Sequence, residues 1–138
     1  MEFNPIIDEQ TILVVDDSNI TRNLIEHVYK DKYKVMMASD GKQAMDIVDV
    51  MPEGTIMAIL LDLNMPNVDG FEVLDYFKNA NLFNRIPVAI ITGEGTDENV
   101  KRAYTYPIVD MLQKPFNEVN IKTIVNKLIM IHDMNKGA

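Results

Sequence analysis

The chain has 138 residues, of which 47% are hydrophobic and 25% charged, and this composition suits one domain with a buried core. Its formal net charge of -8, with lysines and arginines scattered along the sequence, argues against a nucleic-acid-binding surface. The absence of cysteine excludes disulfides and thiolate metal sites, and no apolar run is long enough to span a membrane. We therefore expect a soluble, cytoplasmic protein made of one domain.

Short apolar runs alternate with segments of helical period along the chain. In chain order, the predicted strands cover residues 12–15, 34–38, 56–61, 88–91 and 111–113. A predicted helix follows each strand, and the candidate capping residues for four of these helices are Ser18, Asp40, Asp69 and Asn117. The fourth helix, near residues 99–104, is expected to be short because Pro107 disturbs its end.

This order predicts an α/β fold in which a strand and a helix alternate five times. Such alternation implies parallel strands joined by right-handed crossovers, hence a three-layer α/β/α sandwich around a five-stranded sheet. The uninterrupted apolar runs at 12–15, 56–61 and 88–91 are typical of strands that helices cover on both faces. In open sheets of this class, ligands bind outside the carboxyl ends of the strands.

Polar side chains stand at the carboxyl ends of four of the five predicted strands, namely Asp16, Asp17, Asp62, Thr92 and Lys114. Taken singly, each of them would be interpreted as a helix cap, a turn residue or a solvated lysine. Because the ends of parallel strands share one edge, we expect the five side chains to lie together. Their coincidence at one edge favours a functional site over five unrelated turn residues.

Three neighbouring carboxylates repel one another unless some are protonated or a cation lies among them. An all-oxygen site suits Mg²⁺, whereas Zn²⁺ is not expected because both histidines, His27 and His132, fall on predicted helices away from this edge. A metal ion and a lysine can neutralise a phosphoryl group, and a carboxylate can accept it as an acyl phosphate. Thr92 could donate a hydrogen bond to a further phosphoryl oxygen.

The stretches ILVVDDS, LLDLNMPNVDGFE, AIITGEG and QKPF follow one another at a spacing that resembles the response regulator receiver domain, the CheY-like phosphoacceptor of two-component signalling. The resemblance covers about residues 10–133, which leaves an N-terminal extension over residues 1–9 and a C-terminal tail over 134–138. It implies a flavodoxin-like fold. It also implies that Asp62 is the phosphorylated residue. The implied Mg²⁺ ligands are Asp17 directly, Asp16 largely through water, Asp62, and the backbone carbonyl of Asn64.

The resemblance assigns the remaining residues of the motifs as well. Lys114 would pair with the phosphoryl group, and Thr92 would move toward it and start a conformational switch. The peptide bond from Lys114 to Pro115 is expected to be cis. The side chains of Asn64 and Glu94 would flank the path of an attacking water and so tune the lifetime of the phosphoryl group.

One position departs from the pattern of the family. Three residues before Lys114, where the family usually carries Tyr or Phe as part of the switch, this chain has Met111. Methionine is flexible and has neither a ring nor a hydroxyl. Tyr104 and Tyr106 lie nearby in the sequence and are candidate substitutes.

The first interpretation is therefore a phosphorylation-dependent switch with Mg²⁺ as cofactor, phosphorylated by a histidine kinase or a histidine phosphotransfer protein. It would catalyse only its own phosphorylation and dephosphorylation. A homodimer or an effector would use the surface of residues 99–133.

Two alternatives stay open. A Mg²⁺-dependent phosphohydrolase with an aspartyl-phosphate intermediate usually carries a second Asp two residues after its nucleophile, where this chain has Asn64. A degenerate receiver could serve as a scaffold. A nucleotide site is not expected, since no glycine-rich loop follows the first strand.

Overall fold

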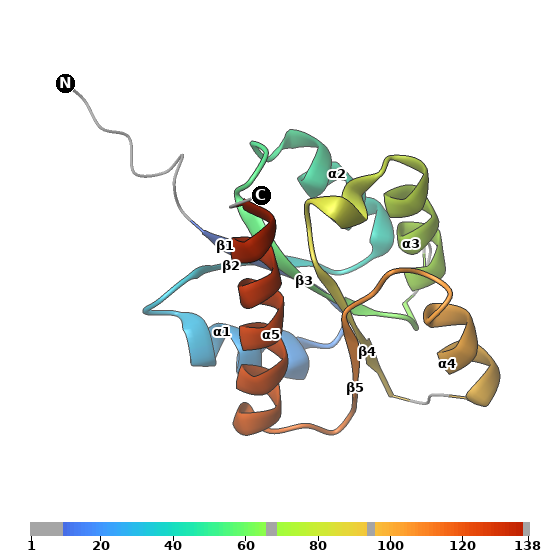
Figure 1. The fold of residues 1–138 in the computed structure, drawn as a ribbon. Coiled ribbons are helices and arrows are strands. Elements are labelled where there is room, and N and C mark those ends of the chain that lie inside the picture. Colours follow the sequence, from blue (N-terminus) through green and yellow to red (C-terminus); the bar gives the residue numbers. More distant parts are fainter. Residues whose placement is uncertain (1–9, 66–68, 94–95, 137–138) are drawn as a thin grey trace.

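The computed structural model describes residues 10–65, 69–93 and 96–136, and Figure 1 shows a parallel sheet with helices on both faces. The sheet has the order β2-β1-β3-β4-β5, and every pairing is parallel. The strands are β1 (Thr11–Val15), β2 (Lys34–Ala38), β3 (Ile56–Asp62), β4 (Val88–Thr92) and β5 (Asp110–Gln113). The helices are α1 (Asn19–Tyr29), α2 (Gly41–Val50), α3 (Gly70–Asn79), α4 (Asp97–Ala103) and α5 (Glu118–Lys136), with a short 3-10 helix, η1 (Leu82–Asn84), after α3.

These elements confirm the predicted α/β/α sandwich. The three central strands are buried along their whole length, as their uninterrupted apolar sequences predict. At the two edges of the sheet, β2 and β5 are mostly half-exposed, which explains their weaker sequence signal. Among the described residues, no helix is long and apolar enough to cross a membrane.

The helices begin where side chains accept hydrogen bonds from their first free backbone amides. The predicted capping residues Ser18, Asp40 and Asp69 accept from the amide three positions later at 3.4, 2.9 and 3.1 Å. Asn117 accepts from the amide of Asn120 at 2.9 Å, and the Asn120 side chain accepts from the amide of Asn117 at 3.0 Å. This reciprocal pair fixes the start of α5.

One helix, α4, differs from the sequence prediction at its start. α4 begins two residues earlier than expected, because Thr96 accepts a hydrogen bond from the amide of Asn99 at 3.1 Å and caps it. The helix has only seven residues, as expected from the proline that follows it.

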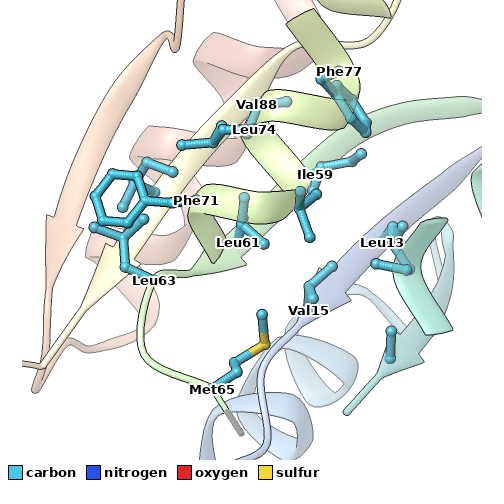
Figure 2. Close-up of a cluster of buried hydrophobic side chains, with 14 of the residues drawn as sticks. Leu13, Val15, Ile59, Leu61, Leu63, Met65, Phe71, Leu74, Phe77 and Val88 are labelled. Carbon is cyan, nitrogen blue, oxygen red and sulfur yellow. The ribbon is translucent and has the colours of Figure 1, made fainter. Parts of the chain in front are cut away.

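Two apolar clusters fill the space between the sheet and its two helical layers. α1 and α5 cover one face, with Ile25 of the first helix and Leu128 of the second among the buried residues. α2, α3 and α4 cover the other face, where Phe71, Leu74 and Phe77 of α3 pack on β3 and β4 (Figure 2). Helices therefore cover both faces of the sheet, and the polar residues lie at its carboxyl edge.

Candidate functional site

The centre of the carboxyl edge lies between β1 and β3, which pair directly with Val15 opposite Leu61. The chain leaves β1 toward β2 on one side of the sheet and continues from β3 toward β4 on the other. In folds of this class, ligands usually bind at such a reversal of strand order, in a crevice outside the strand ends. Asp16 follows β1 here, and Asp62 is the last residue of β3.

Asp16 is completely buried. Its Oδ1 accepts a hydrogen bond from the backbone amide of Ser18 at 2.8 Å, at the entrance to α1. Its Oδ2 lies 2.9 Å from Nζ of Lys114, but no group of the described residues gives that oxygen a well-aligned hydrogen bond. A buried carboxylate oxygen with an incomplete set of partners is suited to a further positive ligand.

Asp62 is 3% exposed, and its two oxygens have different partners. Oδ1 accepts a hydrogen bond from the backbone amide of Asn64 at 2.9 Å, and Oδ2 accepts one from Nζ of Lys114 at 3.2 Å. Burial raises the pKa of Asp62 to about 6, against the lowering effect of the Asn64 amide, and the charge of Asp16 raises it further while Lys114 lowers it. The carboxylate is therefore the more costly form to bury.

Lys114 brings a positive charge into this crevice from the end of β5. Its ammonium contacts both Asp16 and Asp62, and although burial lowers its pKa, these two carboxylates raise the pKa overall. Its backbone amide donates to the carbonyl of Thr92 at 2.8 Å, which ties the ends of β4 and β5 together. The peptide bond between Lys114 and Pro115 is cis, the isomer that the resemblance implies.

The carboxylates fit a metal ion. Oxygens of Asp16, Asp17 and Asp62 lie within 4.8 Å of one another, and Asp17 is exposed while the other two are buried. Carboxylate oxygens at this spacing, open to water on one side, are ligands that Mg²⁺ accepts. Neither histidine joins them: His27 lies on α1 and His132 near the end of α5.

Thr92 is buried at the end of β4, one position beyond the residue that pairs with Asp62. Met111 pairs with Ile90, which lies two positions before Thr92 on β4. Because alternate residues of a strand share a face, Thr92 and Met111 both lie on the face that α2, α3 and α4 cover. The side chain of Asn64 is exposed beside Asp62. Glu94, the second residue expected to affect the phosphoryl lifetime, lies outside the described residues.

The two tyrosines considered as substitutes for a switch aromatic have different surroundings. Tyr104 is 52% exposed. Tyr106 is half-buried, and its hydroxyl donates a hydrogen bond to Asp75 on α3. Neither observation places a ring next to Thr92.

Gly70 contributes to the site through a close contact with the chain that follows Asp62. A Cβ atom at this position would lie 2.7 Å from the carbonyl oxygen of Asp62 and 2.7 Å from Cα of Leu63. The amide of Gly70 donates to the carbonyl of Leu63 at 3.2 Å, so the first turn of α3 rests directly on the chain that leaves Asp62. The only sequence signal for this contact is a glycine placed directly after the capping residue Asp69.

Comparison with known proteins agrees with this geometry. Residues 12–126 match the model of the response regulator receiver domain family. The two-component response regulator ORR3 of rice (Oryza sativa subsp. indica) is 28% identical over 123 residues, which cover 88% of this chain and 92% of the relative.

Solved structures of receiver domains superpose well on this chain. The receiver domain of a LuxO repressor protein from Vibrio parahaemolyticus superposes with a TM-score of 0.81 at 25% identity, over 93% of this chain and 95% of the other. The chemotaxis response regulator CheY4 of Vibrio cholerae gives 0.76 at 26% identity, over 87% and 98%.

Proposed function

Because the chain belongs to the response regulator receiver domain family, we propose that Asp62 accepts a phosphoryl group and that the domain acts as a phosphorylation-dependent switch in two-component signalling. The observation that carries the proposal is the position of the Lys114 ammonium, 3.2 Å from Asp62 and 2.9 Å from Asp16, at the edge where a third carboxylate also lies. Structural ion pairs need two charges, whereas this arrangement gathers four in one crevice.

The donor would be the phosphohistidine of a histidine kinase or of a histidine phosphotransfer protein. In this step an oxygen of Asp62 forms the new bond to phosphorus, the bond from phosphorus to the imidazole nitrogen breaks, and the histidine takes up a proton. Asp62 must be ionised to act as the nucleophile, and with a pKa of about 6 it is mainly ionised at neutral pH.

Asp16, Asp17 and Asp62 would hold Mg²⁺, with the backbone carbonyl of Asn64 as a further ligand. When bound, the ion supplies positive charge against the phosphoryl oxygens as negative charge builds up on them. Asp17 is the most accessible of the carboxylates and would contact the ion directly, whereas Asp16 already uses one oxygen for the amide of Ser18 and would act largely through water.

The remaining residues bind and read out the phosphoryl group. Lys114 would exchange its contact with Asp62 for one with a phosphoryl oxygen, and Thr92 would donate its hydroxyl to another. Because these contacts exist only after phosphorylation, they shift the population toward a second conformer. Asn64 and Glu94 would flank the attacking water, and their polar side chains give no special protection from hydrolysis.

We further propose that residues 10–133 act as the receiver and that the surface of residues 99–133 binds an effector or a second copy. The domain would catalyse its own phosphorylation and dephosphorylation without acting on a free substrate.

Size-exclusion chromatography and thermal unfolding, each with and without beryllofluoride and Mg²⁺, on the wild type and on Asp62→Ala, test the proposal. Beryllofluoride bound to an aspartate stands in for the phosphoryl group. We expect a change in elution or in thermal stability for the wild type only. A wild type that does not respond would instead indicate a scaffold, and turnover of a phosphomonoester would indicate a phosphohydrolase.

A further inference from the structure

α4 is weakly attached to the body of the domain. It lies beside the outer half of the sheet in Figure 1, and of its seven residues only Ala103 is buried. Burial of a single alanine contributes little apolar area, so the position of α4 depends on longer side chains that reach a neighbouring element.

Two such side chains connect the end of α4 to α3. The guanidinium carbon of Arg102 lies 3.9 Å from the centre of the Phe71 ring, within the range of a cation–π interaction. The hydroxyl of Tyr106, in the connection to β5, donates to the carboxylate of Asp75. This hydrogen bond is the main reason that the pKa of Tyr106 is raised.

The two contacts match each other in spacing. Phe71 and Asp75 are four residues apart on α3, one helical turn, and Arg102 and Tyr106 are likewise four residues apart. The ring of Tyr106 also lies 6.4 Å from that of Phe83, in η1. We call Phe71, Asp75, Arg102 and Tyr106 the α3–α4 clamp. Its two contacts, the cation–π interaction and the hydrogen bond, would together oppose both sliding and rotation of α4.

The clamp is connected to the phosphorylation site through the chain itself. Thr92 ends β4, and α4 is capped by Thr96 four residues later. The movement of Thr92 that the proposed function includes would therefore take place four residues before the cap of α4, while the clamp contacts the other end of the helix. Met111, on the same face of the sheet, has no aromatic ring that could move together with Thr92.

We propose that the α3–α4 clamp stabilises the unphosphorylated conformer and is released when the site is phosphorylated. This inference rests on the proposed function. A contact that exists in only one of two conformers favours that conformer by the free energy of the contact. The free energy of a hydrogen bond to a carboxylate is smaller when the carboxylate is exposed, as Asp75 is. We therefore expect the loss of this bond to raise the population of the second conformer roughly three- to tenfold.

The first test needs no ligand. Tyr106→Phe removes the hydroxyl and keeps the ring on Phe83, and Tyr104→Phe is the matched control, since Tyr104 lies two residues away and is exposed. In the metal-free protein, hydrogen exchange in a peptide covering residues 97–106 should be roughly three- to tenfold faster in Tyr106→Phe than in the control. Equal exchange rates in the two variants would overturn the clamp.

The second test measures the coupling to the site. At saturating Mg²⁺, Tyr106→Phe should bind beryllofluoride roughly three- to tenfold more tightly than the wild type, and Tyr104→Phe should not. Faster exchange with an unchanged or weaker beryllofluoride affinity would mean that the clamp does not oppose activation, and would overturn the proposal. A wild type that binds no beryllofluoride would refute the proposed function and the switching role together, whereas the exchange experiment would still report on the contact.

Discussion

Replacing Asp62 by Asn should stabilise the metal-free protein at neutral pH. Asp62 is 3% exposed, and the pKa of its carboxyl rises from 3.8 to about 6 in the folded state, chiefly because of burial. Between these two pH values the folded protein binds more protons than the unfolded chain, so stability falls as the pH rises. Asparagine has nearly the shape of the protonated carboxyl and cannot ionise, and the variant therefore escapes this loss.

The size of the effect follows from the same two values. At about 1.4 kcal/mol for each pKa unit, ionisation of Asp62 costs the folded state about 3 kcal/mol once the pH is well above 6. At pH 4.5 the difference between the variant and the wild type should be only about 1 kcal/mol, because Asp62 is still mostly protonated in the folded protein. For a domain of this length, about 3 kcal/mol corresponds to roughly 10 °C in Tm.

Thermal unfolding in EDTA, followed by circular dichroism from pH 4.5 to pH 8, measures this difference. Its growth with pH is the diagnostic result, since carboxyl groups far from Asp62 titrate alike in both proteins and cancel. Asp17→Asn serves as a control because Asp17 is exposed and its replacement should change Tm far less. A Tm difference that does not depend on pH, or a variant less stable than the wild type at pH 7.5, would refute the reasoning.

Three further changes test other parts of the site. Mg²⁺ should raise the Tm of the wild type, and an equal gain in Asp17→Ala would show that Asp17 is not a ligand. Asn64→Met should slow the loss of the phosphoryl group, measured by phosphate release, because an apolar side chain would shield the bond from water; an unchanged rate would contradict this role. Gly70→Ala should destabilise the fold by about 1–3 kcal/mol in urea unfolding, since its Cβ would lie 2.7 Å from two backbone atoms. Gly93→Ala should cost much less, because its nearest neighbour would be 3.9 Å away.

The architecture could be predicted from sequence because its signals are local. The central strands are uninterrupted apolar runs, and the predicted capping residues sit next to the amides that they bind. The start of α4 was missed because Thr96 is followed by Asp97 and Glu98, which show no apolar period. The signal of its cap is a single hydroxyl, which resembles that of any turn.

The composition of the site could also be predicted, because parallel topology alone brings strand ends together. Its internal contacts could not. No spacing in the sequence encodes the distance between Lys114 and Asp16. The same is true of the close approach of Gly70, at the start of α3, to the carbonyl of Asp62. The same holds for Tyr106, whose partner Asp75 lies 31 residues earlier. Such contacts form only when the helices pack against the sheet.

The ammonium of Lys114 between two carboxylates has a consequence for the choice of ion. Three carboxylates and one ammonium leave this edge with two uncompensated negative charges when every group is ionised. A divalent cation brings that count to zero, whereas a single sodium or potassium ion leaves half of it in place. Cellular sodium and potassium should therefore compete poorly with a divalent cation for this site. Without the positive charge of Lys114, the three carboxylates would carry three negative charges, and a divalent cation would leave one of them uncompensated.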